Sequence, residues 1–128
     1  MNESEKTYNL EKRTSDFAKN VVLFCRGIKQ NPVTNPLINQ LVRAGTSIGA
    51  NYMEANGASS RKDFKNKIHI CKKESQETRY WLKILQDSMP EKETQIEELW
   101  KEAQEFSMIF GKIVGTMNDK DSKIKLAR

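Results

Sequence analysis

The sequence has little of what membrane proteins and secreted proteins depend on. Its longest uninterrupted apolar run is the short stretch from Val21 to Cys25, far below the ~20 residues that a membrane-spanning helix requires. The first residues, MNESEKTYNLEKR, contain no apolar segment of the kind that a secretory signal carries. We therefore expect a cytoplasmic protein that makes no membrane contact.

Residues suited to catalysis or metal binding are also scarce. A di-iron site in a helix bundle needs Glu-x-x-His pairs, but the one histidine, His69, has Asn66 three positions before it. The sequence has no Gly-x-Ser-x-Gly, GxxxxGK[ST] or GxGxxG motif, and neither Cys25 nor Cys71 has metal-ligand spacing. We expect a protein that is not an enzyme and takes no cofactor, metal or small-molecule substrate. Both cysteines are expected to be reduced packing residues.

Four helix-like segments make up most of the 128 residues. The first spans about 10–30 and ends before Pro32, because proline disfavours helical geometry in the residue that precedes it. Asn35 is then expected to cap a second helix, with Pro36 at the first helical position, where its missing N–H costs nothing. Gly57 marks the expected end of that helix.

The third and fourth segments show apolar or small residues at alternating steps of four and three. Ser60 and Asp63 form a variant of the capping box and start the third segment, and Pro90 opens the fourth. Such seams indicate long, nearly antiparallel helices packed at shallow angles. The seam of the third segment is Phe64, Ile68, Cys71, Ser75, Thr78, Leu82 and Leu85, and that of the fourth is Ile96, Leu99, Ala103, Phe106, Phe110, Ile113 and Met117.

The predicted fold is all-α, an antiparallel up-down-up-down four-helix bundle. It forms a single domain over residues 10–117, since a chain of this length has one core. Residues 1–9 are expected to be a frayed N-terminus, and residues 118–128, NDKDSKIKLAR, a frayed polar tail.

The second segment has very little charge for a helix that faces water. Between Thr34 and Ala58 only Arg43 and Glu54 are charged. Either Gly45 and Gly49 let neighbouring helices approach closely, or a second copy of the chain covers this side, and we favour the second copy. Mid-helix glycines cost ~1 kcal/mol each relative to alanine, which suggests a close contact. The expected oligomer interface is Val42, Gly45, Thr46, Gly49, Asn51, Met53, Glu54, Ile70 and Trp81.

Simpler interpretations of three of these interface residues stay open. Asn51 and Glu54 either fix the register of the interface or are ordinary solvated residues. Trp81 alone is more simply explained as a large side chain that caps the core.

The charges are distributed unevenly along the chain, although the net charge is only +5. Residues 61–89 hold eight basic and four acidic residues, whereas residues 90–118 hold three basic and six acidic ones. One sector of the third helix forms a basic stripe that either follows nucleic-acid phosphates or pairs with Glu91, Glu98, Glu102 and Glu105 of the fourth helix. Pairing is slightly favoured. The stripe consists of Arg61, Lys65, Lys72, Arg79 and Lys83.

Two runs of the sequence resemble a known family. "LVRAGTSIGANYMEANGASSRKDF" and "CKKESQETRYWLKIL" are similar to bacterial four-helix-bundle proteins first noticed as products of intervening sequences in large-subunit ribosomal RNA genes. The family pattern is matched by Arg43, Ala44, Ser47, Ile48, Asn51, Glu54, Gly57, Ser60, Lys62 and Phe64, then by Lys73, Glu74, Glu77, Thr78, Tyr80, Trp81 and Leu82. Two departures are Gly49, where many members carry proline, and the inserted Asn56.

The resemblance implies a non-enzymatic bundle that assembles with copies of itself, as a ring-like pentamer. A distant relative of the family, the accessory protein of diversity-generating retroelements, is a basic pentamer that binds nucleic acid. The resemblance thus favours an interaction module that binds the backbone of RNA or DNA. The alternative is a structural scaffold that contacts only proteins and has no affinity for nucleic acid.

Overall fold

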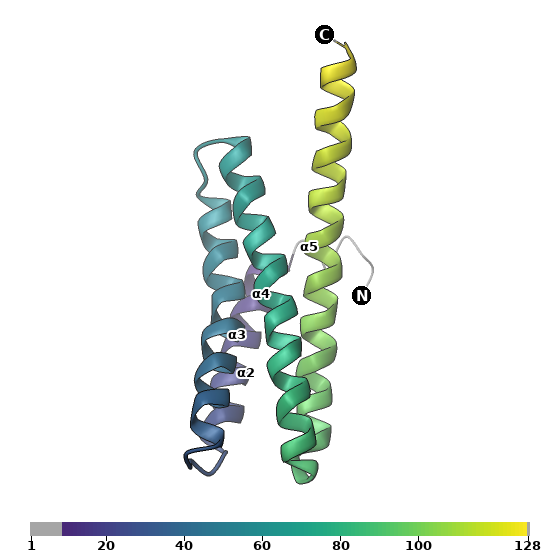
Figure 1. Cartoon of the computed structure of the whole chain (residues 1–128). Coiled ribbons are helices and arrows are strands. Elements are labelled where there is room, and N and C mark those ends of the chain that lie inside the picture. Colours follow the sequence, from purple (N-terminus) through teal and green to yellow (C-terminus); the bar gives the residue numbers. More distant parts are fainter. Residues whose placement is uncertain (1–8, 128) are drawn as a thin grey trace.

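The structure is a computed structural model that describes residues 9–127, and within this range it is entirely helical. The helices are α2 (Leu10–Arg26), α3 (Thr34–Asn56), α4 (Arg61–Ser88) and α5 (Glu93–Ala127), with a 3-10 turn η1 (Pro90–Lys92) before α5. No strand occurs among these residues. The prediction of an all-α four-helix bundle is confirmed. Successive helices run in opposite directions (Figure 1).

The start of α3 differs from the prediction. Asn35 is not the cap, because the side-chain oxygen of Asn31 accepts hydrogen bonds from the backbone N–H groups of Val33 and Thr34, both at 2.9 Å. The helix therefore begins at Thr34, and Pro36 is its third residue. Asn31 thus caps the helix from three residues upstream, because its side chain accepts hydrogen bonds from N–H groups that would otherwise be unpaired.

The other predicted helix ends agree with the structure more closely. Gly57 follows the last residue of α3, and the side chain of Ser60 accepts a hydrogen bond from the backbone N–H of Asp63, as the capping box predicts. The first helix ends at Arg26, four residues earlier than expected. Ile28 is nevertheless buried, with 6% of its surface exposed, so its apolar side chain still belongs to the core.

The core is formed by the predicted seams of α4 and α5, together with the apolar faces of α2 and α3. Phe106 and Phe110 are fully buried in its middle, and the ring of Phe17 on α2 meets Phe106 edge to face, with 5.4 Å between centroids. Towards its C-terminus, α5 buries Val114 more deeply than the predicted Ile113. A straight helix drifts by ~20° per heptad relative to a seven-residue repeat, which explains the shift.

The C-terminal part of α5 contradicts the prediction of a frayed tail from residue 118. The helix continues to Ala127, and Asp121 forms ion pairs with Arg61 and Lys65 in the first turns of α4. Beyond Asp121, α5 rises above the end of α4 (Figure 1). The frayed N-terminus expected for residues 1–9 lies outside the described residues except for Asn9.

The helices do not enclose the core equally on all sides. α3 packs along α2 and α4, and α4 packs along α5, but α2 and α5 touch each other much less. The bundle is therefore closed on three sides and open along the fourth.

Candidate functional site

The two glycines of α3 make close contacts within the chain. A Cβ atom on Gly45 would lie 3.0 Å from Val21 Cγ2, and one on Gly49 would lie 3.2 Å from Thr14 Cβ. Both glycines thus face α2 and let its backbone approach. The structure gives them an intramolecular role, so they are not evidence for a second copy of the chain.

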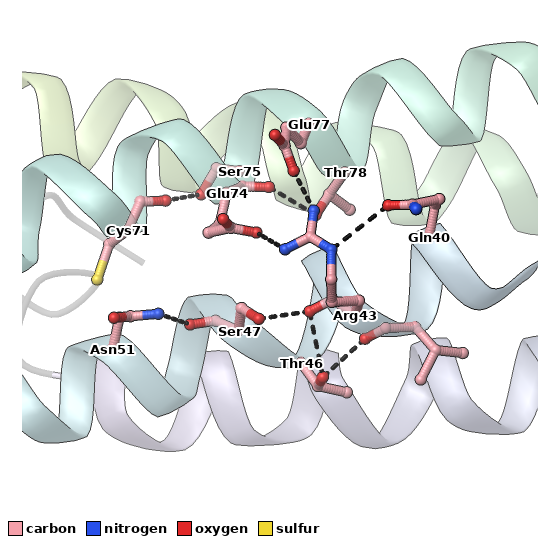
Figure 2. Close-up of polar contacts among 11 residues, drawn as sticks. Gln40, Arg43, Thr46, Ser47, Asn51, Cys71, Glu74, Ser75, Glu77 and Thr78 are labelled. Atoms are coloured by element: carbon pink, nitrogen blue, oxygen red, sulfur yellow. Dashed lines mark hydrogen bonds and ion pairs between the residues drawn. The ribbon is translucent and has the colours of Figure 1, made fainter. Parts of the chain in front are cut away.

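A network of polar side chains joins α3 to α4 (Figure 2). The guanidinium of Arg43 donates from Nη1 to Glu74 Oε2 at 3.1 Å and from Nη2 to Glu77. Glu74 is buried, with 7% of its surface exposed, so Arg43 supplies the charge that its carboxylate needs away from water. These hydrogen bonds hold the pKa of Arg43 above its usual value, with Glu77 as the main cause.

Two further polar residues of α3, Asn51 and Glu54, also have partners within the chain. Asn51 donates from its side chain to the carbonyl oxygen of Ser47 at 2.8 Å, and Lys67 Nζ lies 2.8 Å from Glu54 Oε2. The pair raises the pKa of Lys67, chiefly through its hydrogen bond to Glu54. These contacts explain Asn51 and Glu54 without a neighbouring subunit.

The other residues of the predicted oligomer interface are distributed around the bundle. Val42 and Trp81 are half-buried and pack against the core, while Thr46 bonds to the carbonyl oxygen of Val42. Ile70 is half-buried on α4. Met53 is the one large apolar member that is mostly exposed, with 67% of its surface free. On the uncharged flank of α3, Val42 is thus partly covered within the chain, and Met53 is the large apolar residue that projects from it.

The preferred pairing of the basic stripe with the acidic flank of α5 is wrong. Arg13 of α2, a residue that the sequence analysis did not single out, lies 2.5 Å from Glu102 through Nη2 and Oε1, and 3.9 Å from Glu105. The acidic flank therefore faces α2. The sequence does set Arg13 apart, because this charged residue lies one turn before Phe17 on the apolar side of its helix.

The basic stripe does face α5, but it meets a different set of groups there. Arg61 and Lys65 pair with Asp121, at 3.0 and 3.1 Å, and hold its pKa below the usual range, with Lys65 as the main cause. The stem of Lys72 passes over Gly111, where a Cβ would lie 3.6 Å from Lys72 Cε. Asp121 neutralises one end of the stripe only.

The middle of the stripe is built around an aromatic ring. Arg79 Cζ lies 5.7 Å and Lys83 Nζ 6.0 Å from the ring centroid of Trp100, and Arg79 also donates to Gln104. Cations over a tryptophan face are attracted by its electron density. Trp100 and Gln104 thus hold these basic groups along the α4–α5 seam without neutralising them.

Acidic and basic side chains are sorted onto different sides of the bundle. From residue 64 to 86, the acids of α4 are Glu74 and Glu77, and both pair with Arg43 on the α3 side. From residue 99 to 118, the acids of α5 are Glu102 and Glu105, which face Arg13 on the α2 side. We call the resulting surface the basic face, and it consists of Lys72, Arg79 and Lys83, with Lys65, which pairs with Asp121, at one end.

The open side of the bundle contains a groove of about 590 Å³ between α2 and α5. Phe17, Phe24 and Leu99 form its apolar lining, and Glu98 and Asp16 stand along its walls. The pKa of Asp16 is lowered, mainly by its hydrogen bond from Lys12. This groove combines apolar surface with negative charge, whereas the basic face lies on the other side of α5.

Groups that could support chemistry are isolated or buried. His69 is exposed on α4. Burial raises the pKa of Cys25 to about 11 and that of Cys71 to about 12, so both thiols are protonated at neutral pH. Among residues 9–127, no group of three or more potential metal ligands is present, and no helix is both long and apolar enough to cross a membrane.

Comparisons with known proteins agree with the fold. The model of a family described as 23S rRNA-intervening sequence protein matches residues 6–112. A crystal structure of a protein with unknown function from the S23 ribosomal protein family of Bacteroides thetaiotaomicron VPI-5482 is 32% identical, with a TM-score of 0.74. The match covers 82% of this chain and 97% of that one. No curated protein matches the sequence.

Proposed function

Because the chain belongs to the 23S rRNA-intervening sequence protein family, whose model matches most of its length, we propose that it is a non-enzymatic module that binds the phosphate backbone of RNA. The observation that carries the proposal is the sorting of charge. The carboxylates in the middle of α4 and α5 are paired towards α3 or α2, so among the described residues Lys72, Arg79 and Lys83 of the basic face form no ion pair.

The spacing of the basic groups suits a backbone more than a base sequence. Lys65, Lys72 and Arg79 recur every seven residues, which is about 10 Å along a helix. Lysine and arginine side chains that contact phosphates displace counterions and carry no sequence information. Trp100 is half-buried beneath Arg79 and Lys83, so it offers little free surface for base stacking. We therefore propose contacts that depend on charge and are tolerant of sequence.

Self-association is part of the same proposal. The exposed side chain of Met53 supports it, because helical spacing places Met53 on the same uncharged face of α3 as Ala50 and Thr46. The family resemblance favours a pentamer. Copies arranged in a ring would repeat the basic face and strengthen the positive potential that attracts RNA.

The test is the binding of a fluorescent, mixed-sequence RNA oligonucleotide followed by anisotropy at rising salt. For a single strand the logarithm of affinity should fall with the logarithm of salt, with a slope of about −0.7 for each neutralised phosphate. Four contacts would give a slope of about −3. The variant Lys72→Ala/Arg79→Ala/Lys83→Ala should bind more weakly and lose about two units of slope.

The matched control replaces three exposed lysines outside the basic face, in Lys12→Ala/Lys19→Ala/Lys29→Ala. This variant has the same net charge as the test variant, so equal losses in the two would mean that overall charge drives binding. Absence of any complex at low salt would favour the second candidate, a scaffold that contacts only proteins. Exposed Leu23, Val33 and Met53 are the observation in favour of that candidate.

A further inference from the structure

At the groove α2 and α5 touch each other little, whereas the other neighbouring helices of the bundle pack along their length. Phe17, Phe24 and Leu99 line the groove, and Leu23 stands at its edge with 61% of its surface exposed. Apolar side chains at the open side of a bundle gain stability when another apolar element excludes water from them. The apolar lining of the groove therefore suits a segment that brings apolar side chains of its own.

The walls of the groove prefer a positively charged occupant. Asp16, Glu98 and Glu102 line the groove, and cations meet only two of these charges: Arg13 pairs with Glu102, and the exposed Lys12 pairs with Asp16. Among residues 9–127, no cation forms an ion pair with Glu98.

The end of α5 has the complementary properties. After Asp121, the last residue that pairs with α4, the helix rises above the rest of the bundle (Figure 1). We call residues 122–127 the C-terminal overhang. Lys123 and Lys125 are exposed on it, and so are Ile124 and Leu126, at 51% and 88%. Two large apolar side chains on a lone helical end are costly to leave in water.

We propose that the C-terminal overhang of one copy docks in the α2–α5 groove of a second copy. The inference rests on the self-association proposed above and assigns a contact surface to it. Lys123 and Lys125 would face Glu98 and Asp16, while Ile124 or Leu126 covers the apolar lining.

The contact has to form between different molecules as long as α5 is a continuous helix. Lys123 and Glu98 are separated along this helix by about 37 Å, at ~1.5 Å per residue, so the overhang does not reach the groove of its own chain. Each copy has one overhang and one groove. Such contacts join copies either reciprocally in a dimer or successively in a ring.

Residues 1–8 are a less suitable occupant. They contain two glutamates and one lysine, so their charge does not complement the acidic walls.

The test is a charge swap read by light scattering and sedimentation of the full chain. Variant one is Lys123→Glu/Lys125→Glu, which makes the overhang acidic. Variant two is Asn20→Lys/Glu98→Lys, which makes the groove basic and spares Arg13 and Glu102. Each variant alone should fall from the wild-type mass towards 14.8 kDa, with an association constant reduced at least about tenfold. The two variants mixed should associate again, because each overhang then meets a groove of opposite charge.

Control variant Lys29→Glu/Lys73→Glu changes the net charge as much as variant one and should keep the wild-type mass. Circular dichroism verifies that all variants remain helical, which is expected because every substituted residue is exposed. A wild-type chain that associates, with both variants unchanged in mass, would overturn the groove contact and leave self-association standing. A wild-type chain that stays at 14.8 kDa at high concentration would overturn both.

Discussion

Lys65 Nζ lies 3.1 Å from Asp121 Oδ2, in a contact that joins the beginning of α4 to the last part of α5. Arg61 binds the other oxygen of the same carboxylate at 3.0 Å. One acid thus neutralises the end of the basic stripe and also holds the helix from which the C-terminal overhang projects.

Replacing Asp121 by asparagine should increase RNA binding. Lys65 and Arg61 would then be free to meet phosphates, so we expect affinity at low salt to rise about fivefold and the salt slope to steepen by about one unit. Anisotropy titrations at several salt concentrations measure both quantities. Asp119→Asn is the control, because Asp119 is exposed on the same helix and forms no ion pair among the described residues. An equal gain in the control would show that net charge alone matters.

Lowering the pH should loosen the end of α5. Lys65 and Arg61 depress the pKa of Asp121, so the contact is present at neutral pH and is lost as pH falls below about 4 and through the lowered pKa. Amide exchange of residues 122–127 should therefore be more strongly protected at pH 6 than at pH 3, after correction for intrinsic rates. The Asp121→Asn variant should already lack this extra protection at pH 6. Unchanged protection in that variant would mean that the ion pairs do not hold the helix end.

Alanine at Gly49 and alanine at Gly115 should have opposite effects. A Cβ at Gly49 would lie 3.3 Å from the backbone carbon of Thr14, which moves only with the whole of α2, whereas Gly115 has no neighbouring atom within 4 Å. We expect Gly49→Ala to destabilise the bundle by about 1–3 kcal/mol and Gly115→Ala to stabilise it by up to ~1 kcal/mol. Urea unfolding curves measure both free energies. Stabilisation by both substitutions would refute the close packing of α2 on α3.

Removing Arg43 should be more harmful than its exposed position suggests. Arg43→Ala leaves the buried carboxylate of Glu74 without its cation, and we expect a loss of about 1–3 kcal/mol in the free energy of unfolding. The double variant Arg43→Ala/Glu74→Gln should recover part of this loss, because no buried charge remains. A double variant as unstable as the sum of the two single ones would show that the residues act independently.

Much of the fold was predictable because the apolar residues recur in the sequence with the same period at which a helix turns them towards the core. The alternating steps in α4 and α5 placed Ile68, Leu82, Phe106 and Phe110 in the core, and the structure buries all of them. The tail was mispredicted for a related reason. Past Met117 no apolar seam continues, so nothing in the pattern announced that Asp121 would secure α5 through an ion pair.

The candidate surfaces were harder to predict because a sequence does not say which neighbour a helix face meets. The sequence predicted a basic stripe and an acidic flank that pair with each other, yet Glu102 faces Arg13 of α2, and Glu91 lies in the turn before α5. The two glycines likewise indicated close approach, but their partners, Val21 and Thr14, lie within the same chain. The sequence pattern shows which residues share one face of a helix. Which neighbouring helix that face contacts depends on how the helices are arranged around the core.

The weak contact between α2 and α5 has a dynamic consequence. α2 is held mainly by α3, and this helix pair packs less extensively than α3 with α4 or α4 with α5. Detaching α2 therefore disrupts a single long helix pair, and partial opening of this kind is a local unfolding event with a lower free energy than global unfolding. The N-terminal helix is the segment that should come loose first when the chain is warmed or pulled.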